Sequence, residues 1–96
     1  MLIQQKQEGS KGSFYVENNG RLLAGMTYSM TGTELMIIDH TEVADELKGK
    51  NIGLQLVQAA VEHARANHIK IIPLCPFANS VFKKKAAEFG DVLRTN

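Results

Sequence analysis

Residues 48 to 53 read Lys-Gly-Lys-Asn-Ile-Gly and stand directly before a segment with helical periodicity. The unpaired N–H groups of a helix start carry partial positive charge, so lysines there oppose the helix dipole by about 0.3–1 kcal/mol unless an anion binds. Gly49 and Gly53 allow backbone conformations closed to other residues, and Asn51 tolerates left-handed φ. Such a bend can aim several N–H groups at one phosphate. The alternative is a glycine-containing connector with solvated lysines.

Cys75 and His40 are the side chains best suited to nucleophilic and proton-transfer chemistry. A thiolate is a strong nucleophile when its pKa is lowered from about 8.5, and imidazole side chains can exchange protons near neutral pH. A lone cysteine in an apolar strand is more often an inert small hydrophobe. His63 and His68 are expected to face solvent, and no spacing of Asp, His or Cys suggests a metal site.

The composition is that of an ordinary folded protein. The chain has 96 residues, of which 44% are hydrophobic and 22% charged, with a formal net charge of +1. These values predict one domain over residues 1–96 and argue against a general nucleic-acid reader. The single cysteine excludes an internal disulfide, and the start lacks the apolar run of a signal peptide or a membrane span. We expect a cytoplasmic protein with no membrane partner, either a monomer or a weak dimer.

The first half of the chain has the pattern of antiparallel strands. Alternating apolar residues flank Asn19-Gly20, a pair that favours a two-residue hairpin turn because both positions need positive φ. The second arm covers residues 22–30, and Thr31-Gly32 then turns the chain into a third strand over 34–43. A short strand near residues 2–5 is a further candidate.

The second half has the pattern helix, strand, helix. Apolar residues recur every three or four positions over 51–67, which predicts an amphipathic helix, and 69–75 is typical of a buried strand parallel to an earlier one. Pro73 requires that strand to end, bulge or keep a free edge. A second helix is predicted over 79–89, with Gly90 as its stop. Together these elements predict an α+β fold with a mixed or mostly antiparallel sheet.

The loop at 48–53 thus lies between a strand-rich half and a helix that leads to an apolar strand. This order resembles the GNAT superfamily of acetyl-CoA-dependent N-acetyltransferases. Its signature [RQ]xxGx[GA] maps onto the loop, with Lys48 where Arg or Gln is usual and Asn51 where the first glycine is usual. Residues 37–77 also resemble a compact, single-domain branch with DHT before the loop and Cys-x-Phe after the next strand. The resemblance implies a small GNAT-like fold in which that strand splays from its neighbour and a second short helix follows.

The resemblance also implies acetyl-CoA as cofactor and an amine, either a small molecule or a protein lysine, as acceptor. In GNAT proteins the strand before the loop bonds the pantetheine arm through its backbone, and the loop amides hold the pyrophosphate. The slot left by the splayed strand would receive the arm. The implied cofactor-binding residues are Thr41, Glu42, Val43, Lys48, Gly49, Lys50, Asn51, Ile52, Gly53, Pro76, Phe77 and Lys83.

The resemblance places the acetyl thioester near Cys75. GNAT enzymes commonly use a tyrosine of the second helix to protonate the leaving thiolate, whereas this chain has Phe82 there. Cys75 could instead take the acetyl group itself, with His40 as its proton acceptor if their strands are neighbours. Lysines 83–85 would begin the second helix and meet the 3′-phosphate of the cofactor, or else form a solvated face.

The sequence therefore suggests an acetyl-CoA-dependent N-acetyltransferase that moves the acetyl group to an amine directly or through Cys75. A CoA-binding module with little or no turnover, in which Cys75 only packs, is the alternative. A third hypothesis is an interaction domain that does not bind CoA. The acceptor cannot be identified from these residues.

Overall fold

The computed structural model describes residues 2–94, which form a five-stranded sheet in the order β1-β2-β3-β4-β5. The strands are β1 (Gln4–Glu8), β2 (Lys11–Asn18), β3 (Arg21–Thr31), β4 (Leu35–Val43) and β5 (Lys70–Pro73). Neighbours are antiparallel except β4 and β5, which are parallel. The predicted α+β class with a mixed sheet is confirmed.

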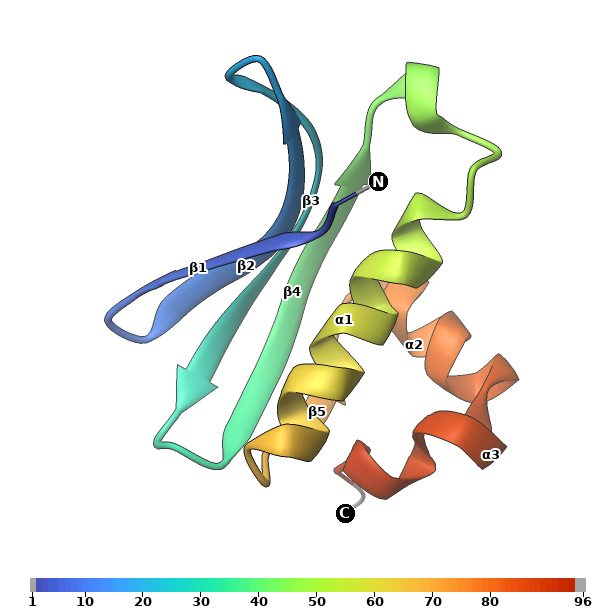
Figure 1. Ribbon diagram of the computed structural model, residues 1–96. Helices are drawn as coiled ribbons and strands as arrows, with labels where there is room; N and C mark the ends of the chain where they lie inside the picture. Colours follow the sequence, from blue (N-terminus) through green and yellow to red (C-terminus); the bar gives the residue numbers. More distant parts are fainter. Residues whose placement is uncertain (1, 95–96) are drawn as a thin grey trace.

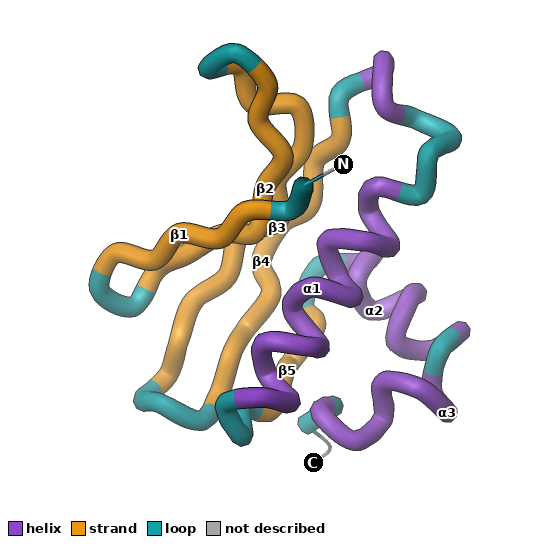
Figure 2. Tube along the Cα trace, in the orientation of Figure 1, coloured by secondary structure: helices purple, strands orange, loops and turns teal. Residues whose placement is uncertain are grey.

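The helical elements form a second layer (Figures 1 and 2). They are α1 (Ile52–Ala66), α2 (Pro76–Lys84), α3 (Ala86–Phe89) and two 3₁₀ turns, η1 (Asp45–Leu47) and η2 (Gly90–Val92). Figure 1 shows α1 across one face of the sheet, with α2 and α3 alongside it. Within residues 2–94, every helix is too short or too polar to cross a bilayer.

The core lies between α1 and the sheet. The apolar stripe of α1 is fully buried at Leu56, Val57, Ala60, Val61 and Ala64, as the predicted three- and four-residue spacing requires. It belongs to one buried cluster with strand residues from β2, β3, β4 and β5. Because this packing fixes α1, its first turn is held beside the end of β4, and there the candidate site forms.

The predicted hairpin turn is confirmed, whereas the first strand lies later than predicted. Asn19 and Gly20 have φ of 52° and 77°, both positive as the turn requires. β1 covers Gln4–Glu8 rather than residues 2–5, because its place is set by partners in the sheet. Gln5 and Gln7 hydrogen-bond the buried Tyr28 hydroxyl at 2.9 and 3.0 Å, a role that polar side chains do not reveal in the sequence.

The second helix differs from its prediction at both ends. It begins at Pro76 rather than residue 79, since a proline fits the first helical position, where no N–H partner is needed. It ends at Lys84, and the chain restarts as α3 after Lys85. Gly90 does not stop the run in a left-handed conformation, because its φ is −63° and it continues into η2.

Candidate active site

β5 separates from β4 after Ile38. The ladder ends at the pair Ile38 and Pro73, and the N–H groups of Leu74 and Cys75 both lie 3.1 Å from the Ile38 carbonyl. β4 continues to Val43, so its last residues have no strand partner on the β5 side. The predicted splay is therefore present, and it leaves a slot along this edge of β4.

A β-bulge in β4 decides which side chains face the slot. Tyr28 of β3 pairs with Ile38, but the next residue back along β3, Thr27, pairs with His40, so Asp39 is the extra residue. The Asp39 carboxylate accepts a hydrogen bond of 3.0 Å from the Ser29 hydroxyl. Ile38 faces the core before the bulge, and the odd-numbered positions face it afterwards, because the extra residue reverses the alternation.

Both the side chains and the backbone groups of Thr41 and Val43 therefore face the slot. The N–H of Ala44 donates to the Leu23 carbonyl at 2.8 Å, so by alternation the backbone groups of residue 42 also face β3. Those of Thr41 and Val43 point away from β3, to the side that β5 has left. Glu42 does not meet the predicted role, because its backbone faces β3 and its side chain lies on the opposite face of the sheet.

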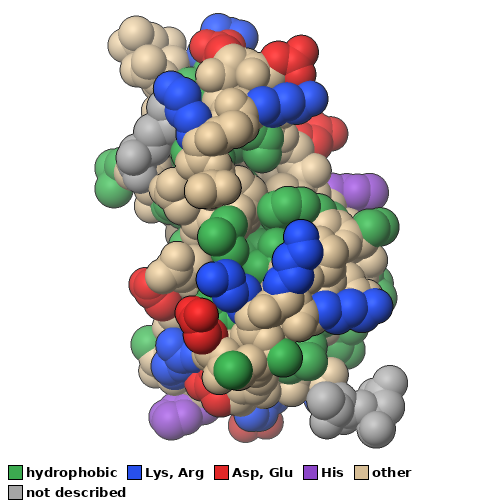
Figure 3. Space-filling view, turned by 90° about the vertical axis from the view of Figure 1, so that its right-hand side faces the viewer, with side chains coloured by type: hydrophobic (Ala, Val, Ile, Leu, Met, Phe, Trp, Pro, Cys, Tyr) green, Lys and Arg blue, Asp and Glu red, His purple; other side chains and the backbone are tan. Residues whose placement is uncertain are grey.

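A cleft with a volume of about 470 Å³ continues this slot between the end of β4, the 48–54 segment and α2. We call it the basic cleft, because three lysines line it and no carboxylate does. Its apolar walls include Val43, Phe77 and Val81. Figure 3 views the side of the molecule that carries α2 and shows Lys and Arg side chains around an apolar patch. The cleft is therefore suited to an elongated anion with an apolar section.

The backbone amides at the start of α1 are free to bind that anion. Gly49 and Asn51 have φ of 84° and 58°, the left-handed bends expected from the sequence. Asn51 is the N-cap of α1, and its side chain makes no capping hydrogen bond. Across residues 2–94, no protein group accepts a hydrogen bond from the N–H of Gly49, Asn51, Ile52 or Gly53. These donors lie at the positive end of the helix dipole.

The two lysines of the loop differ in placement. Lys48 lines the basic cleft and forms an exposed ion pair with Asp45 at 2.8 Å. The hydrogen bond between them raises the pKa of Lys48 and lowers the pKa of Asp45. Lys50 is exposed and does not line the cleft. Only one of the two predicted loop lysines is therefore placed toward the cleft.

The lysine run lies at the end of α2, not at its start. Lys84 and Lys85 line the basic cleft, whereas Lys83 does not. Residues three or four apart share a helix face, so Val81 and Lys84 lie on the cleft side. The predicted phosphate contact is thus better placed at Lys84 and Lys85 than at Lys83.

Close packing against Phe77 requires a glycine at position 53, and the sequence does not reveal this contact. Gly53 lies inside α1 and lacks positive φ, so it does not help to bend the loop. A Cβ at this position would lie 2.5 Å from Cζ of Phe77. The far edge of the Phe77 ring, which is 41% exposed, therefore packs against the first turn of α1, and Phe77 lines the cleft. Pro76, also predicted to bind the cofactor, is exposed and lies outside the cleft lining.

Cys75 lies at the inner end of the slot as the N-cap of α2. Its thiol is free and buried, with Sγ 3.5 Å from Oγ1 of Thr41. Burial raises the pKa of Cys75, but hydrogen bonds from the Thr41 hydroxyl and from the backbone N–H groups of Ala78, Phe77 and Thr41 outweigh it, so the pKa is lowered. Cys75 thus combines a position at the start of a helix with a lowered pKa, and both favour the thiolate over the thiol.

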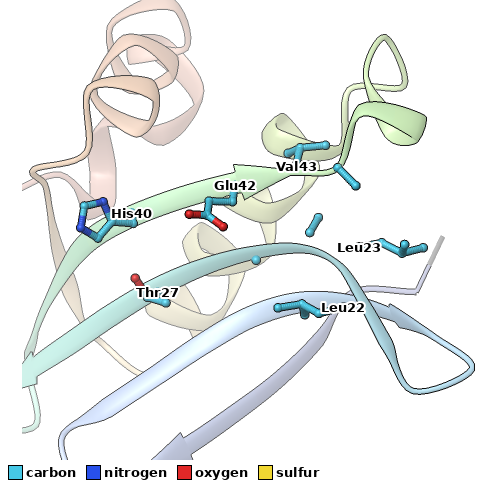
Figure 4. Close-up of a pocket in the computed structure, with 9 residues that line it drawn as sticks. Leu22, Leu23, Thr27, His40, Glu42 and Val43 are labelled. Carbon is cyan, nitrogen blue, oxygen red and sulfur yellow. The ribbon is translucent and has the colours of Figure 1, made fainter.

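The structure does not bring His40 to Cys75. Thr41 lies on the Cys75 side of β4, and His40, its neighbour beyond the bulge, lies on the other face with Glu42 (Figure 4). Sequence reasoning missed Thr41 as the partner of the thiol because no sequence signal marks the bulge. Among residues 2–94, no three side chains of His, Cys, Asp or Glu are grouped to hold a metal ion.

Solved structures share this fold. A GCN5-like protein from Staphylococcus aureus, determined by NMR in solution, is 36% identical with a TM-score of 0.71, and the match covers 97% of this chain and 89% of that one. Ribosomal-protein-alanine N-acetyltransferase from Brucella melitensis biovar Abortus 2308 has 16% identity and a TM-score of 0.67, with 81% of this chain and 62% of that chain covered. AAC(6')-Iy, in complex with the bisubstrate analogue CoA-S-monomethyl-acetylneamine, has 13% identity and a TM-score of 0.57, with coverage of 93% and 68%.

At these low identities the last two proteins support the fold alone. The comparison with curated proteins gives no match. The family model of GCN5-related N-acetyltransferases matches residues 13–92, which include the splayed strands, the loop before α1 and Cys75. With the Staphylococcus aureus relative covered almost end to end, the conclusion is that this chain belongs to the GCN5-related N-acetyltransferase family.

Proposed function

We propose that this protein transfers an acetyl group from acetyl-CoA to an amine through an S-acetyl intermediate on Cys75. The family accounts for the use of acetyl-CoA. The observation that carries the proposal is the position of Cys75, which lies beside the free edge of β4 with its thiol against Thr41 and its pKa lowered. A merely packed cysteine would have its pKa raised by burial.

The basic cleft is the proposed cofactor site. The backbone groups of Thr41 and Val43 would bond the pantetheine arm as an added strand does, because they face the side that β5 has left. The free N–H groups between Gly49 and Gly53 would bind the pyrophosphate. Lys84 and Lys85 would attract the 3′-phosphate. Each contact matches one part of the cofactor to one feature of the cleft.

Two balanced steps follow from this geometry. The Cys75 thiolate attacks the thioester carbonyl, the bond to the CoA sulfur breaks, and CoA leaves with the proton that Cys75 gave up. The amine nitrogen then attacks the acetyl-Cys75 carbonyl, the bond to Cys75 Sγ breaks, and the proton that the nitrogen loses as the amide forms restores the Cys75 thiol. Holding the thioester beside the thiol supplies most of the acceleration, because it makes the first step intramolecular.

The placement of the tyrosines supports the thiol route over direct transfer. Among residues 2–94, neither tyrosine faces the slot: Tyr28 is buried and bonded to Gln5 and Gln7, and Tyr15 lies under the Lys6 ammonium, 4.9 Å from its ring centre. Neither can protonate a leaving thiolate in the basic cleft. In the thiol route the first leaving group takes the proton that Cys75 itself releases.

Mass spectrometry of the intact protein tests the proposal. Incubation with acetyl-CoA and no amine should add the mass of one acetyl group, labile to hydroxylamine, and Cys75→Ser should abolish it. Serine is a suitable replacement because it is favoured at the N-cap position that Cys75 occupies. Amine-dependent CoA release without any adduct would overturn the Cys75 route in favour of direct transfer. CoA binding with neither adduct nor release would leave a binding module.

A further inference from the structure

A second cleft, of about 460 Å³, lies on the other face of the same segment of β4. Figure 4 shows His40, Glu42 and Val43 along β4, with Thr27 and Leu22 on the neighbouring strand β3. Val43 lines both clefts. The two clefts therefore meet at this end of β4.

The second cleft has the opposite charge to the basic cleft. Glu42 is the only acidic residue among its lining residues within 2–94, and no Lys or Arg lines it. In this part of the chain Glu42 forms no ion pair, whereas nearby Glu46 is bound to Arg21 at 2.6 Å. An unneutralised carboxylate in a concave site favours a cationic ligand. The acetyl donor is an anion, so this cleft suits the other reactant.

Gly25 opens the floor of the cleft directly opposite Glu42. The two residues pair across β3 and β4, and a Cβ on Gly25 would meet no heavy atom within 4 Å. Gly25 does not have positive φ, so the backbone does not require glycine there. A glycine inside a strand costs stability and often marks the close approach of a ligand. The open space continues along Leu22, which is 60% exposed, and Val43.

The cleft lies across β4 from the thiol. Thr41, whose hydroxyl contacts Cys75, stands in the strand between His40 and Glu42. β5 has left this part of β4, so no second strand closes the edge between the two faces. This open edge is where a nitrogen on the His40 side of the strand would approach an acetyl group on Cys75.

We propose that this cleft, the acceptor cleft, binds a primary ammonium group carried on an unbranched aliphatic chain. Glu42 binds the ammonium, His40 takes the proton that the nitrogen must lose before attack, and the methylene chain lies over Gly25 along Leu22 and Val43. This inference rests on the proposed function for its reaction but not for its binding. A lysine side chain and a free polyamine share this chemistry.

An amide NMR titration of the CoA-saturated protein tests the binding without requiring turnover. One arm uses putrescine, and the other uses a short peptide that is blocked at both ends and contains one lysine. Either ligand should shift the amides of Gly25, His40 and Glu42, and the arm with the lower dissociation constant identifies the source. Loss of one exposed charge contact is worth at most about 1 kcal/mol, so Glu42→Gln should weaken binding up to about fivefold.

Two further variants make the result decisive. A Cβ at Gly25 meets no heavy atom within 4 Å, and Gly25→Val would extend its branched side chain into the cleft, so it should abolish the shifts. Glu17→Gln removes an exposed carboxylate of β2 that lines neither cleft and should bind amines as the wild type does. Amine-induced shifts that lie elsewhere, or that survive in Gly25→Val, would overturn the acceptor cleft. That failure is distinct from failure of the proposed function, which is recorded by the absence of an acetyl adduct.

Discussion

His40 and Thr41 of β4 face opposite sides of the sheet, and the bulge at Asp39 decides which side each of them faces. Strict alternation from Ile38 would place His40 on the side of the thiol, but the bulge at Asp39 puts Thr41 there instead. The predicted pair of Cys75 and His40 is thereby replaced by Cys75 and Thr41. The proton-transfer role that we propose for His40 therefore concerns the acceptor amine and not Cys75.

Thr41→Val tests the thiol environment. This nearly isosteric change removes a hydroxyl that lowers the pKa of Cys75, so the pKa should rise. Less thiolate then exists at any pH below the midpoint, and alkylation by iodoacetamide should slow there, with the midpoint of the pH–rate profile moved to higher pH. Thr31→Val, at the exposed end of β3, should leave the profile unchanged. An unshifted midpoint in Thr41→Val would show that this hydroxyl does not tune the thiol.

Asn51 and Asn19 provide a matched test of the loop conformation. Both have left-handed φ, 58° and 52°, and alanine at either position should cost about 1 kcal/mol of unfolding free energy. Only Asn51→Ala should also weaken CoA binding, because only Asn51 bends the loop that presents free amides. Chemical denaturation and calorimetric titration measure the two effects. Equal CoA affinity in both variants would show that the loop conformation does not contribute to CoA binding.

At the scale of elements, the sequence was sufficient to predict the turns, helices and strand ends that depend on nearby residues alone. The Asn19-Gly20 turn, the periodic helix α1 and the end of β5 at Pro73 all follow from backbone preferences or burial periodicity. β1 and the start of α2 were misplaced, since pairing with β2 sets the first and the exit from the splayed strand sets the second. The bulge had no local signal, and it decides that the backbone of Glu42 faces β3 and not the slot.

Gly12→Ala tests how the β1–β2 hairpin closes over the core. A Cβ at Gly12 would lie 2.4 Å from Cζ of the buried Tyr28 ring and 2.8 Å from the Lys6 carbonyl, so the ring or the backbone must shift. Overpacking of this kind costs about 1–3 kcal/mol. Gly25→Ala, which adds the same methyl group to open space in β3, should be neutral or stabilising. Urea denaturation of both variants checks this, and equal stability would contradict the packing described for Tyr28.

At the scale of the whole molecule, β4 separates two clefts of opposite charge. The sequence located the bent loop that presents free amides at the start of α1, because its glycine and asparagine spacing carries the signal. The sequence prediction assigned Lys83 to the cofactor, whereas Lys84 and Lys85 line the cleft in the structure. The side of α2 on which a lysine lies depends on where the helix begins, and the sequence placed that start too late. It could not find the acceptor cleft, whose residues come from two strands and meet only through pairing.

The lysines of α2 give a prediction for the stability of the whole domain. CoA at one hundred times its dissociation constant should raise the unfolding free energy by about 2.7 kcal/mol. A Lys84→Ala, Lys85→Ala double variant should lose part of this gain at the same CoA concentration, because both side chains line the basic cleft. Lys83→Ala removes one positive charge outside the cleft and should keep the full gain. Equal losses in all lysine variants would indicate a general charge effect instead.

The most direct test of the account is the amide NMR spectrum of the protein titrated with CoA. If the basic cleft is the cofactor site, the largest shifts should fall on the N–H groups of Gly49, Asn51 and Gly53 at the start of α1 and on Thr41 and Val43 at the free edge of β4. Amides of the β1–β2 hairpin should not move. Saturable binding that leaves both sets unshifted, or no binding at all, would contradict the account.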